Sequence, residues 1–341
     1  YPSRIRQIIP SFGLLWIGML HDFLLWRGGK AKMRKLLPVA KGIIDFFEQY
    51  RNANGLIEDL RSWNFIDWVE DWPGGVPQGA DKGVSSIINW QWVDAVGQLA
   101  KLCEALGDFP LAELYRLKAK EMSSVLVKSF WDERRGLFAD TLEHDSFSEH
   151  AQCLAVISGT LPEEIFETLK TTLPAAKGIT RTTVYFTHYY FEACRELGLE
   201  EQLYERLSLW MKFRKLNLET VLERPEPSRS DCHAWSAHPL FHFYATILGI
   251  RPSKPGFAAV RIAPNLGPLS WAKGEIPHPA GGFIKVSLRK EAGLLNAEIE
   301  LPEGLPGIFV YNGVTQRISG SFNTFSVELE LPEILARLNY H

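Results

Sequence analysis

The residues best suited to chemistry gather in one connection, LNLETVLERPEPSRSDCHAWSAHP, at positions 216–239. Carboxylates and imidazoles stand there beside an indole: Glu219, Glu223, Glu226, Asp231, His233, Trp235 and His238. Glu223 follows Leu222 and precedes a proline-restricted stretch, which favours a fixed side chain. A carboxylate on a stiff loop, with His233 following it, suits a general base that activates water. We therefore predict that Glu223 carries chemistry, whereas Glu219 and Glu226 are typical of surface charges.

A second connection, DLRSWNFIDWVEDWPGGVPQG at positions 59–79, alternates indoles with carboxylates. The side chains concerned are Trp63, Asp67, Trp68, Glu70, Asp71 and Trp72. Such a loop could line a sugar pocket, because a carboxylate accepts hydrogen bonds from vicinal hydroxyls while an indole covers the apolar face of the ring. The same aromatic residues could equally do no more than hold a long loop together, and the sequence leaves both interpretations open.

Other kinds of chemistry find little support. The sequence has no phosphate-binding G-x-x-x-x-G-K-[ST] motif, no G-x-G-x-x-G after a strand and no G-x-S-x-G nucleophile elbow. The four cysteines show no C-x-x-C pairing, and His144, His150 and His188 lack the i, i+4 partner that a helical metal site needs. The sequence therefore predicts no cofactor and no metal. Carboxylate chemistry remains.

Charge and hydropathy exclude two classes of partner. The 37 Lys and Arg against 40 Asp and Glu give a net charge of 37 − 40 = −3, which is unsuited to a nucleic-acid-binding surface. The longest apolar stretch, from Phe12 to Trp26, is interrupted by His21 and Asp22, so no membrane insertion is predicted.

Up to about residue 250 the apolar residues recur at helical spacing, with turn signals between the segments. Ser11 is a candidate cap for a helix that stops at Gly28, and a broad apolar face runs from Ser86 to Leu106 and closes at Gly107. In all, about nine helices are predicted, the last over residues 234–248. Helices in short-looped succession form antiparallel hairpins, and a dozen in a ring would make an α/α toroid. Nine helices are three short of a full ring, so the predicted fold is a mainly α, six-hairpin toroid that is incomplete in this chain.

After Gly249 closely spaced prolines end the helical pattern, and alternating segments follow. The predicted strands are 259–262, 269–274, 283–289, 294–301, 307–311 and 324–331. A small antiparallel β-sandwich is their natural packing. We predict two domains, an α/α-barrel catalytic domain over residues 1–250 and the β-sandwich over residues 251–341.

Several long segments resemble the inverting α-L-rhamnosidases among the glycoside hydrolases. They are YPSRIRQIIPSFGLLWIGMLHDF, SWNFIDW, FWDERRGLFAD, ETVLERPEPSRSDCHAWSAHP and FAAVRIAPNLGPLSWAKGEIPHPAGG. The resemblance runs nearly end to end. It implies an α/α six-hairpin catalytic domain followed by a β-domain, and hydrolysis of terminal α-L-rhamnosyl residues in a rhamnose-containing glycoside or oligosaccharide.

The resemblance also implies roles for single residues. The general base of the family, in a T-x-x-E pattern, falls on Glu223, and its sugar-binding histidine falls on His233. The aromatic floor of the pocket falls on Trp68 and Trp16, and Asp67 is the implied acceptor for a sugar hydroxyl.

The general acid of the family, a Glu in an early Asp-x-x-Arg-x-Glu segment, has no counterpart in this sequence. We therefore expect the acid and roughly three helices to lie upstream of Tyr1, and we expect the 341-residue chain alone to be inactive. A truncated toroid would expose apolar helix faces, which predicts self-association. The expected location of the protein is a bacterial periplasm or cytoplasm.

Two alternatives stay open. One is a different α/α-barrel glycosidase or a polysaccharide lyase, for which the stretch Tyr185 to Tyr190 would have to supply a Tyr or His base. The other is a non-catalytic carbohydrate-binding or scaffold protein that kept the aromatic pocket.

Overall fold

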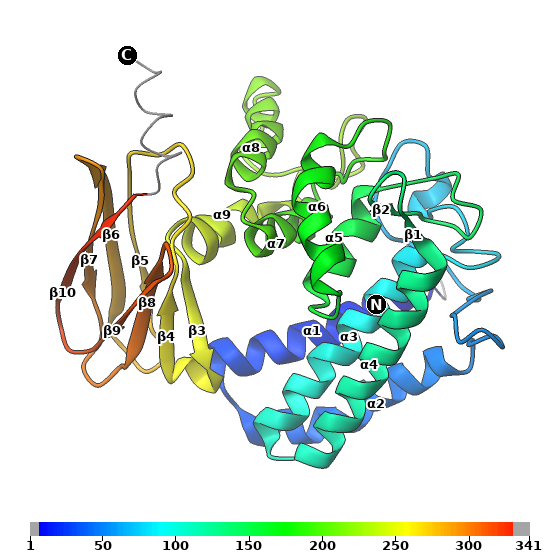
Figure 1. Cartoon of the computed structure of the whole chain (residues 1–341), viewed down its shortest axis with the longest axis horizontal. Helices are drawn as coiled ribbons and strands as arrows, with labels where there is room; N and C mark the ends of the chain where they lie inside the picture. The colour runs from blue at the N-terminus through cyan, green and yellow to red at the C-terminus, as the bar shows by residue number, and fades with distance from the viewer. Residues whose placement is uncertain (1–6, 330–341) are drawn as a thin grey trace. The chain divides into compact units, whose positions relative to one another are not determined.

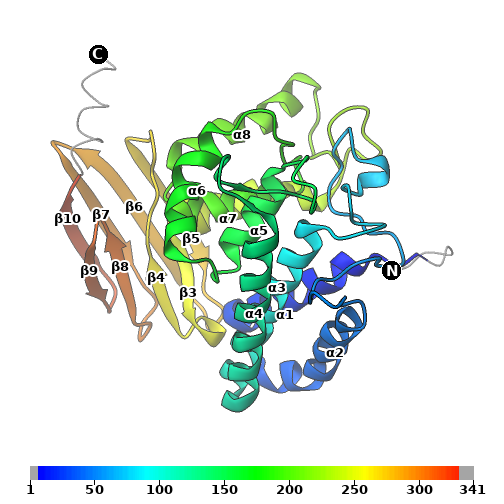
Figure 2. The same cartoon turned by 45° about the vertical axis from the view of Figure 1, so that its right-hand side comes forward.

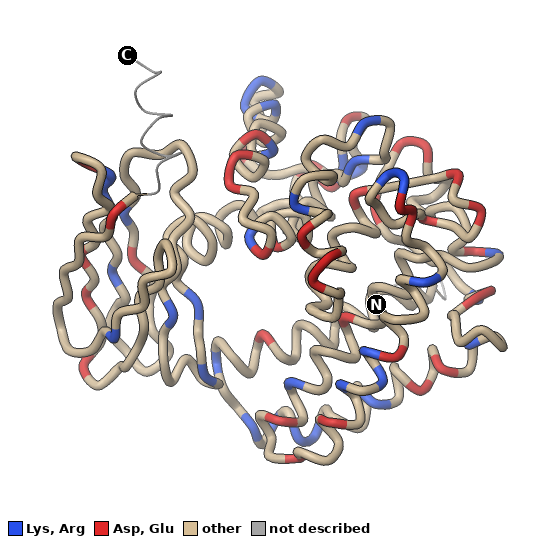
Figure 3. The backbone as a smooth tube through the Cα atoms, in the orientation of Figure 1, with Lys and Arg blue, Asp and Glu red and all other residues tan. Residues whose placement is uncertain are grey.

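A computed structural model of the chain describes residues 7–329. The chain forms two compact units, which we call the helical unit (residues 1–22 with 30–236) and the β unit (residues 23–29 with 237–341). The domain boundary predicted after residue 250 stays a prediction. Basic and acidic residues are interspersed along both units rather than sorted by sign (Figure 3), in keeping with the small net charge of −3.

Helices make up most of the helical unit. They are α1 (Pro10–Arg27, of which residues 23–27 belong to the β unit), α2 (Lys30–Glu48), α3 (Ser86–Leu106), α4 (Phe109–Phe130), α5 (Glu149–Ile157), α6 (Glu163–Ala175), α7 (Thr187–Leu197) and α8 (Glu200–Lys215). Helix α3 is buried on nearly every side and packs against α2, α4 and α5. Figures 1 and 2 both show α3 beside α4. No described helix is both long and apolar enough to cross a membrane.

Helix ends follow local chemistry in most places. Gly107 takes a left-handed conformation (φ 89°) that closes α3, and the side chain of Asp108 accepts a hydrogen bond from the Leu111 N–H at 3.2 Å to open α4. The cap predicted at Ser11 is wrong, because α1 begins one residue earlier. The Ser11 hydroxyl instead donates to the Phe65 carbonyl at 2.6 Å, a long-range bond that joins α1 to the connection between α2 and α3.

The last predicted helix, over residues 234–248, is broken into three pieces. A 3₁₀ turn η2 (Ala234–Ala237) precedes the short helix α9 (Pro239–His242), which runs into the π-helical turn η3 (Phe243–Ile247). Pro239 has no backbone N–H to donate, so a continuous α-helical ladder cannot pass through it.

The β unit contains two four-stranded sheets. Their strands are β3 (Ile250–Lys254), β4 (Ala259–Ile262), β5 (Trp271–Pro277), β6 (Phe283–Glu291), β7 (Leu294–Glu300), β8 (Gly307–Tyr311), β9 (Val314–Ile318) and β10 (Asn323–Glu328). One sheet has the order β10-β7-β6-β5 and the other the order β3-β4-β8-β9. Apolar side chains from both sheets form one core, as in a sandwich. The 3₁₀ turn η4 (Pro255–Phe257) connects β3 to β4.

Two details of the β unit differ from prediction. The pairing of β4 with β8 is parallel, whereas the other pairs are antiparallel. Strands β3 and β9 were missed, since Pro252 interrupts the pattern of β3 and β9 is almost wholly exposed. The end of the predicted strand 324–331 lies outside the described residues. The overall prediction of a mainly helical domain followed by a small β-sandwich is confirmed.

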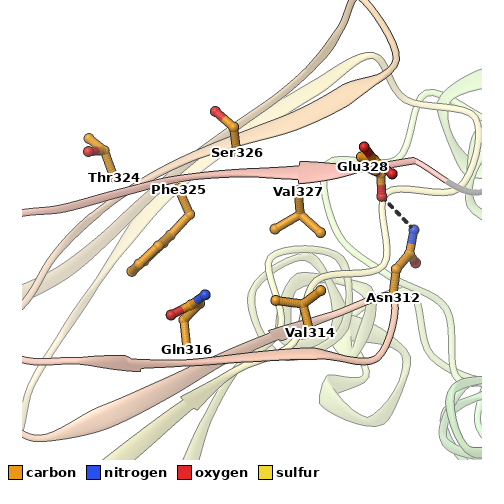
Figure 4. A pocket seen from close by; sticks show the side chains of 8 residues that line it. All are labelled: Asn312, Val314, Gln316, Thr324, Phe325, Ser326, Val327 and Glu328. Carbon is orange, nitrogen blue, oxygen red and sulfur yellow. Dashed lines mark hydrogen bonds between the residues drawn. The ribbon is translucent and has the colours of Figure 1, made fainter.

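A cavity of about 550 Å³ opens between the edge strands β9 and β10. Figure 4 shows Phe325 and Val327 of β10 pointing toward Val314 and Gln316 of β9. Asn312 closes one end by donating its Nδ2–H to the Glu328 carbonyl at 3.1 Å. The two sheets are therefore less tightly joined at this edge than in their shared core.

Asp140 is a buried titratable group in the helical unit, just after the hairpin of β1 (Trp131–Asp132) and β2 (Leu137–Phe138). Burial raises the pKa of its carboxyl from 3.8 to about 6, although a hydrogen bond from the Ser148 hydroxyl at 2.7 Å opposes the shift. The native state thus holds a proton that the unfolded chain releases. This contribution to stability is complete below about pH 4 and is lost as the pH rises through 6.

We therefore expect Asp140→Asn to gain stability relative to the native sequence by up to about 3 kcal/mol as the pH is raised from 4 to 7. Asn keeps an acceptor for Ser148 and has no proton to lose. Urea unfolding of both proteins across that range measures the difference. A constant difference would show that Asp140 titrates normally.

Candidate functional site

Aromatic rings from three separate segments of the helical unit meet around Phe65. Phe65 is fully buried and lies in the long connection between α2 and α3. Its ring centroid is 4.9 Å from that of Trp68, and it stacks on Trp235 at 6.0 Å and on Tyr185 at 6.3 Å. The connection 49–85, the turn η2 and the segment before α7 are thereby joined. The sequence analysis gave Phe65 no role, because nothing local distinguishes it from the aromatic residues around it.

Glu223 lies at the centre of this group. The residue is only 7% exposed, and Oε1 accepts a hydrogen bond from the Trp68 indole N–H at 3.1 Å. The Arg229 guanidinium lies 3.8 Å from the same oxygen. The backbone carbonyl of Glu223 accepts from the Trp235 indole N–H at 2.7 Å. Side chain and backbone are thus held by indoles from two different segments.

The loop that carries Glu223 is closed on itself by backbone bonds. The Glu223 N–H donates to the Ser230 carbonyl and the His233 N–H donates to the Val221 carbonyl, both at 2.9 Å. The Ser236 hydroxyl donates to the Leu222 carbonyl at 2.6 Å. These bonds explain why a connection without regular structure presents one fixed carboxylate.

Two predicted sugar-binding residues lie close to Glu223. Trp68 is half-buried, and the guanidinium carbons of Arg224 and Arg229 lie over its ring at 5.2 and 5.1 Å. His233 is half-buried, and its ring centroid is 4.4 Å from that of Trp235, the residue bonded to the Glu223 carbonyl. The structure therefore brings Glu223, Trp68 and His233 into one group.

Asp67 is placed differently from its neighbour Trp68. Its side chain has no exposed surface, and its two oxygens accept hydrogen bonds from the Trp68 N–H, from the His150 imidazole and from the N–H and hydroxyl of Thr183. This environment does not fit the predicted role of Asp67 as the acceptor for a sugar hydroxyl, because protein donors already surround the carboxylate.

Trp16 is half-buried on α1. Within the described part of the chain, no hydrogen bond or ring contact connects it to Glu223, Trp68 or His233. Its predicted place in the pocket floor stays a prediction. Within the described residues of the helical unit, no three His, Cys, Asp or Glu side chains lie close enough to share a metal ion.

Gly75 allows the connection between α2 and α3 to fold this tightly. It has φ 74°, and an added Cβ would lie 2.4 Å from the Phe65 ring and 2.9 Å from the Asp67 carbonyl oxygen. The Gly75 carbonyl in turn accepts from the N–H groups of Ile66 and Asp67. The backbone here requires glycine for both its angle and its space.

Gly75→Ala is expected to destabilise the helical unit by about 1–3 kcal/mol, since a left-handed alanine is strained and its methyl group displaces Phe65. Gly178→Ala is a matched control, because Gly178 also has a positive φ (66°) but an added Cβ there meets nothing within 4 Å. Urea unfolding measures the loss of stability in both variants. Gly75→Ala combines backbone strain with a collision against Phe65, whereas Gly178→Ala has the backbone strain alone. Equal losses would mean that the approach to Phe65 costs nothing.

Comparison with known proteins gives consistent matches. Residues 23–247 match the bacterial alpha-L-rhamnosidase six-hairpin glycosidase domain, and residues 249–311 match the bacterial alpha-L-rhamnosidase C-terminal domain. An alpha-L-rhamnosidase of Alteromonas sp. (strain LOR) is 24% identical in an alignment 314 positions long, which covers 85% of this chain and 33% of that protein. The chain thus spans about a third of the length of this curated relative.

Solved structures show the same fold. The GH78 family rhamnosidase of Bacillus sp. GL1 superposes with a TM-score of 0.82 at 24% identity, covering 94% of this chain and 35% of its own. The alpha-L-rhamnosidase of Streptomyces avermitilis, solved with L-rhamnose, superposes with a TM-score of 0.73 at 14% identity, covering 93% and 32%.

Proposed function

This chain belongs to the bacterial α-L-rhamnosidase family, and from that premise we propose that it is part of an enzyme that hydrolyses terminal α-L-rhamnosyl residues with inversion, using Glu223 as general base. The observation that carries the proposal is the setting of Glu223: the residue is only 7% exposed, and the Trp68 indole holds its carboxylate at 3.1 Å within a cluster of aromatic rings. Sugar sites combine apolar ring faces with a few fixed polar groups in this way.

The contacts of Glu223 suit a base. Among the described residues, Trp68 and Arg229 both approach Oε1, which leaves Oε2 to accept a proton from water. Inversion needs a second, protonated carboxyl group about 6.5–9.5 Å away on the other side of the sugar. We assign only the base.

We propose that Trp68 and His233 contact the rhamnose ring. The Trp68 indole offers an apolar face, and the His233 imidazole offers a hydrogen-bonding atom. Both side chains lie in the cluster that contains Glu223. The Arg229 side chain, which is 55% exposed, can leave the Trp68 ring when a sugar takes its place. Trp16 joins the proposal on the family resemblance alone.

Calorimetric titration of the chain with L-rhamnose tests the binding site. We expect binding that is weakened at least tenfold in Trp68→Ala and His233→Ala, with D-glucose as the matched control sugar. Equal affinity for both sugars, or variants that bind as the native chain does, would contradict the proposal.

The stereochemistry is tested in the longest natural polypeptide that contains these residues. Inversion of an α-L-rhamnoside gives β-L-rhamnose as the first product, which proton NMR distinguishes from the α anomer before mutarotation. Initial release of the α anomer would rule out the inverting mechanism.

A polysaccharide lyase is less well supported. Its base would come from the stretch 185–190, yet burial raises the pKa of the Tyr185, Tyr189 and Tyr190 hydroxyls. A tyrosine base needs the opposite shift, so these side chains are poorly suited to remove a proton at neutral pH.

A further inference from the structure

We propose that Asp67 is a positioning residue for Glu223 rather than a ligand of the sugar, and that with His150 and Thr183 it fixes both segments that hold Glu223. This inference rests on the proposed function of Glu223 as base. It concerns how the helical unit keeps that carboxylate in place.

The carboxylate of Asp67 has no acceptor site left for a substrate. Oδ1 accepts hydrogen bonds from the backbone N–H of Trp68 at 2.9 Å and from the Thr183 hydroxyl at 2.5 Å. Oδ2 accepts from His150 Nε2 at 2.9 Å and from the Thr183 N–H at 2.7 Å. A carboxylate offers about four acceptor positions, and protein donors fill all of them. The side chain is also wholly buried, so a sugar hydroxyl could not reach it.

One route from Asp67 leads to the side chain of Glu223. Asp67 accepts a hydrogen bond from the backbone N–H of Trp68 and so fixes the backbone there. The indole N–H of the same residue donates to Glu223 Oε1 at 3.1 Å. The backbone conformation at Trp68 sets where its indole lies, and the position of the Glu223 carboxylate therefore depends on that conformation.

The second route leads to the backbone of Glu223. Asp67 holds Thr183 by two hydrogen bonds, and two residues later the Tyr185 ring stacks on Trp235 with centroids 4.5 Å apart. The Trp235 indole donates to the Glu223 carbonyl at 2.7 Å. The buried carboxylate of Asp67 thus helps to hold both the side chain and the backbone of Glu223.

His150 completes the arrangement as a rigid donor. It is fully buried on α5, with the rings of Trp72 and Phe186 at 4.6 and 4.5 Å. Its Nε2 faces Asp67, while Nδ1 has no partner among the described residues. A buried N–H without an acceptor is costly, so Nε2 is the ring nitrogen that fits the role of donor at this site.

The chain supplies a matched control for this network. Thr182 and Thr183 are adjacent, and each donates its N–H and its hydroxyl to a buried carboxylate, Thr182 to Glu149 and Thr183 to Asp67. Only the Asp67 bonds lead to Glu223. Replacing either threonine with valine removes one hydroxyl donor from the same segment and keeps the backbone donor.

The test uses proton–nitrogen NMR of the tryptophan indole groups, with Trp68, Trp235 and Trp210 assigned through single Trp→Phe variants. We expect Asp67→Asn to shift the indole signals of both Trp68 and Trp235, and Thr183→Val to shift that of Trp235. The Trp210 indole, which donates to the Ser236 carbonyl, is the internal reference and should stay in place. Thr182→Val should leave the Trp68 and Trp235 signals unmoved.

If Asp67→Asn does not fold, Thr183→Val against Thr182→Val decides the matter. Unmoved Trp235 signals in a folded Thr183→Val variant, or equal shifts in the two threonine variants, would overturn the proposal. These readings need no sugar, so they remain decisive even if the chain fails to bind rhamnose. That failure would count against the proposed function alone.

Kinetics of the longest natural polypeptide give a second reading. A misplaced base costs up to about 100-fold in rate, so Asp67→Asn should lower kcat of α-L-rhamnoside hydrolysis by about 10–100-fold with little change in KM. If Asp67 bound the sugar directly, its replacement would instead mainly raise KM and the Kd for L-rhamnose. That result would restore Asp67 to the sugar-binding role.

Discussion

Glu223→Gln is expected to lower kcat of α-L-rhamnoside hydrolysis by about 10² to 10⁴ in the longest natural polypeptide that contains these residues, because an amide cannot take a proton from water. Gln has the same shape and keeps an oxygen for the Trp68 indole, which donates at 3.1 Å in the native chain. L-rhamnose binding should therefore change little. Steady-state kinetics with an aryl α-L-rhamnoside measure the first quantity and calorimetry the second.

Glu226→Gln is the matched control for that experiment. Glu226 lies three residues further along the same loop and is exposed. Among residues 7–329 its side chain accepts a hydrogen bond only from the local Ser228 N–H, at 2.7 Å. Its replacement should leave kcat within a factor of about two, as for a surface charge. If the two variants lose activity alike, or if Glu223→Gln keeps its full rate, Glu223 is not the base.

Arg206→Met is expected to have the largest effect on stability, about 3–5 kcal/mol less free energy of unfolding at pH 7. Arg206 and Glu149 form a buried pair, with Nη2 to Oε1 at 2.6 Å and Nη1 to Oε2 at 2.9 Å. Removing the guanidinium leaves a carboxylate buried without its counter-charge. Urea unfolding followed by circular dichroism measures the loss.

The pH dependence of this loss has a definite sign. Burial by itself raises the pKa of Glu149, but the hydrogen bonds and charge of Arg206 outweigh it and hold the pKa below its usual 4.5. The pair therefore stabilises the fold above that value and loses its contribution as the pH falls through the lower native pKa. The difference between Arg206→Met and the native chain should shrink at acidic pH.

Arg195→Met serves as the control for a surface pair. Arg195 contacts Glu192 and Glu196 on its own helix and is partly exposed, so its loss should cost no more than about 1 kcal/mol. Comparable losses in the two arginine variants would show that burial of the Glu149 pair adds nothing.

Local patterns were sufficient to predict much of this protein. Helix α3 begins and ends where the sequence indicated, at Ser86 and Leu106, because an apolar periodicity and a terminal glycine are properties of neighbouring residues. The strands β4 and β8 likewise match their predicted limits. Glu223 was singled out by its place in a proline-restricted loop, and Trp68 and His233 by resemblance.

Only the tertiary structure decided which of these residues meet and in what surroundings. Asp67 and Trp68 are adjacent in sequence, yet one is sealed inside by Thr183, 116 positions away, while the other bonds to Glu223, 155 positions away. The parallel pairing of β4 with β8 joins strands with the whole of β5 to β7 between them. Contacts over such separations depend on how whole elements pack, so a local pattern names the residue types but not their partners.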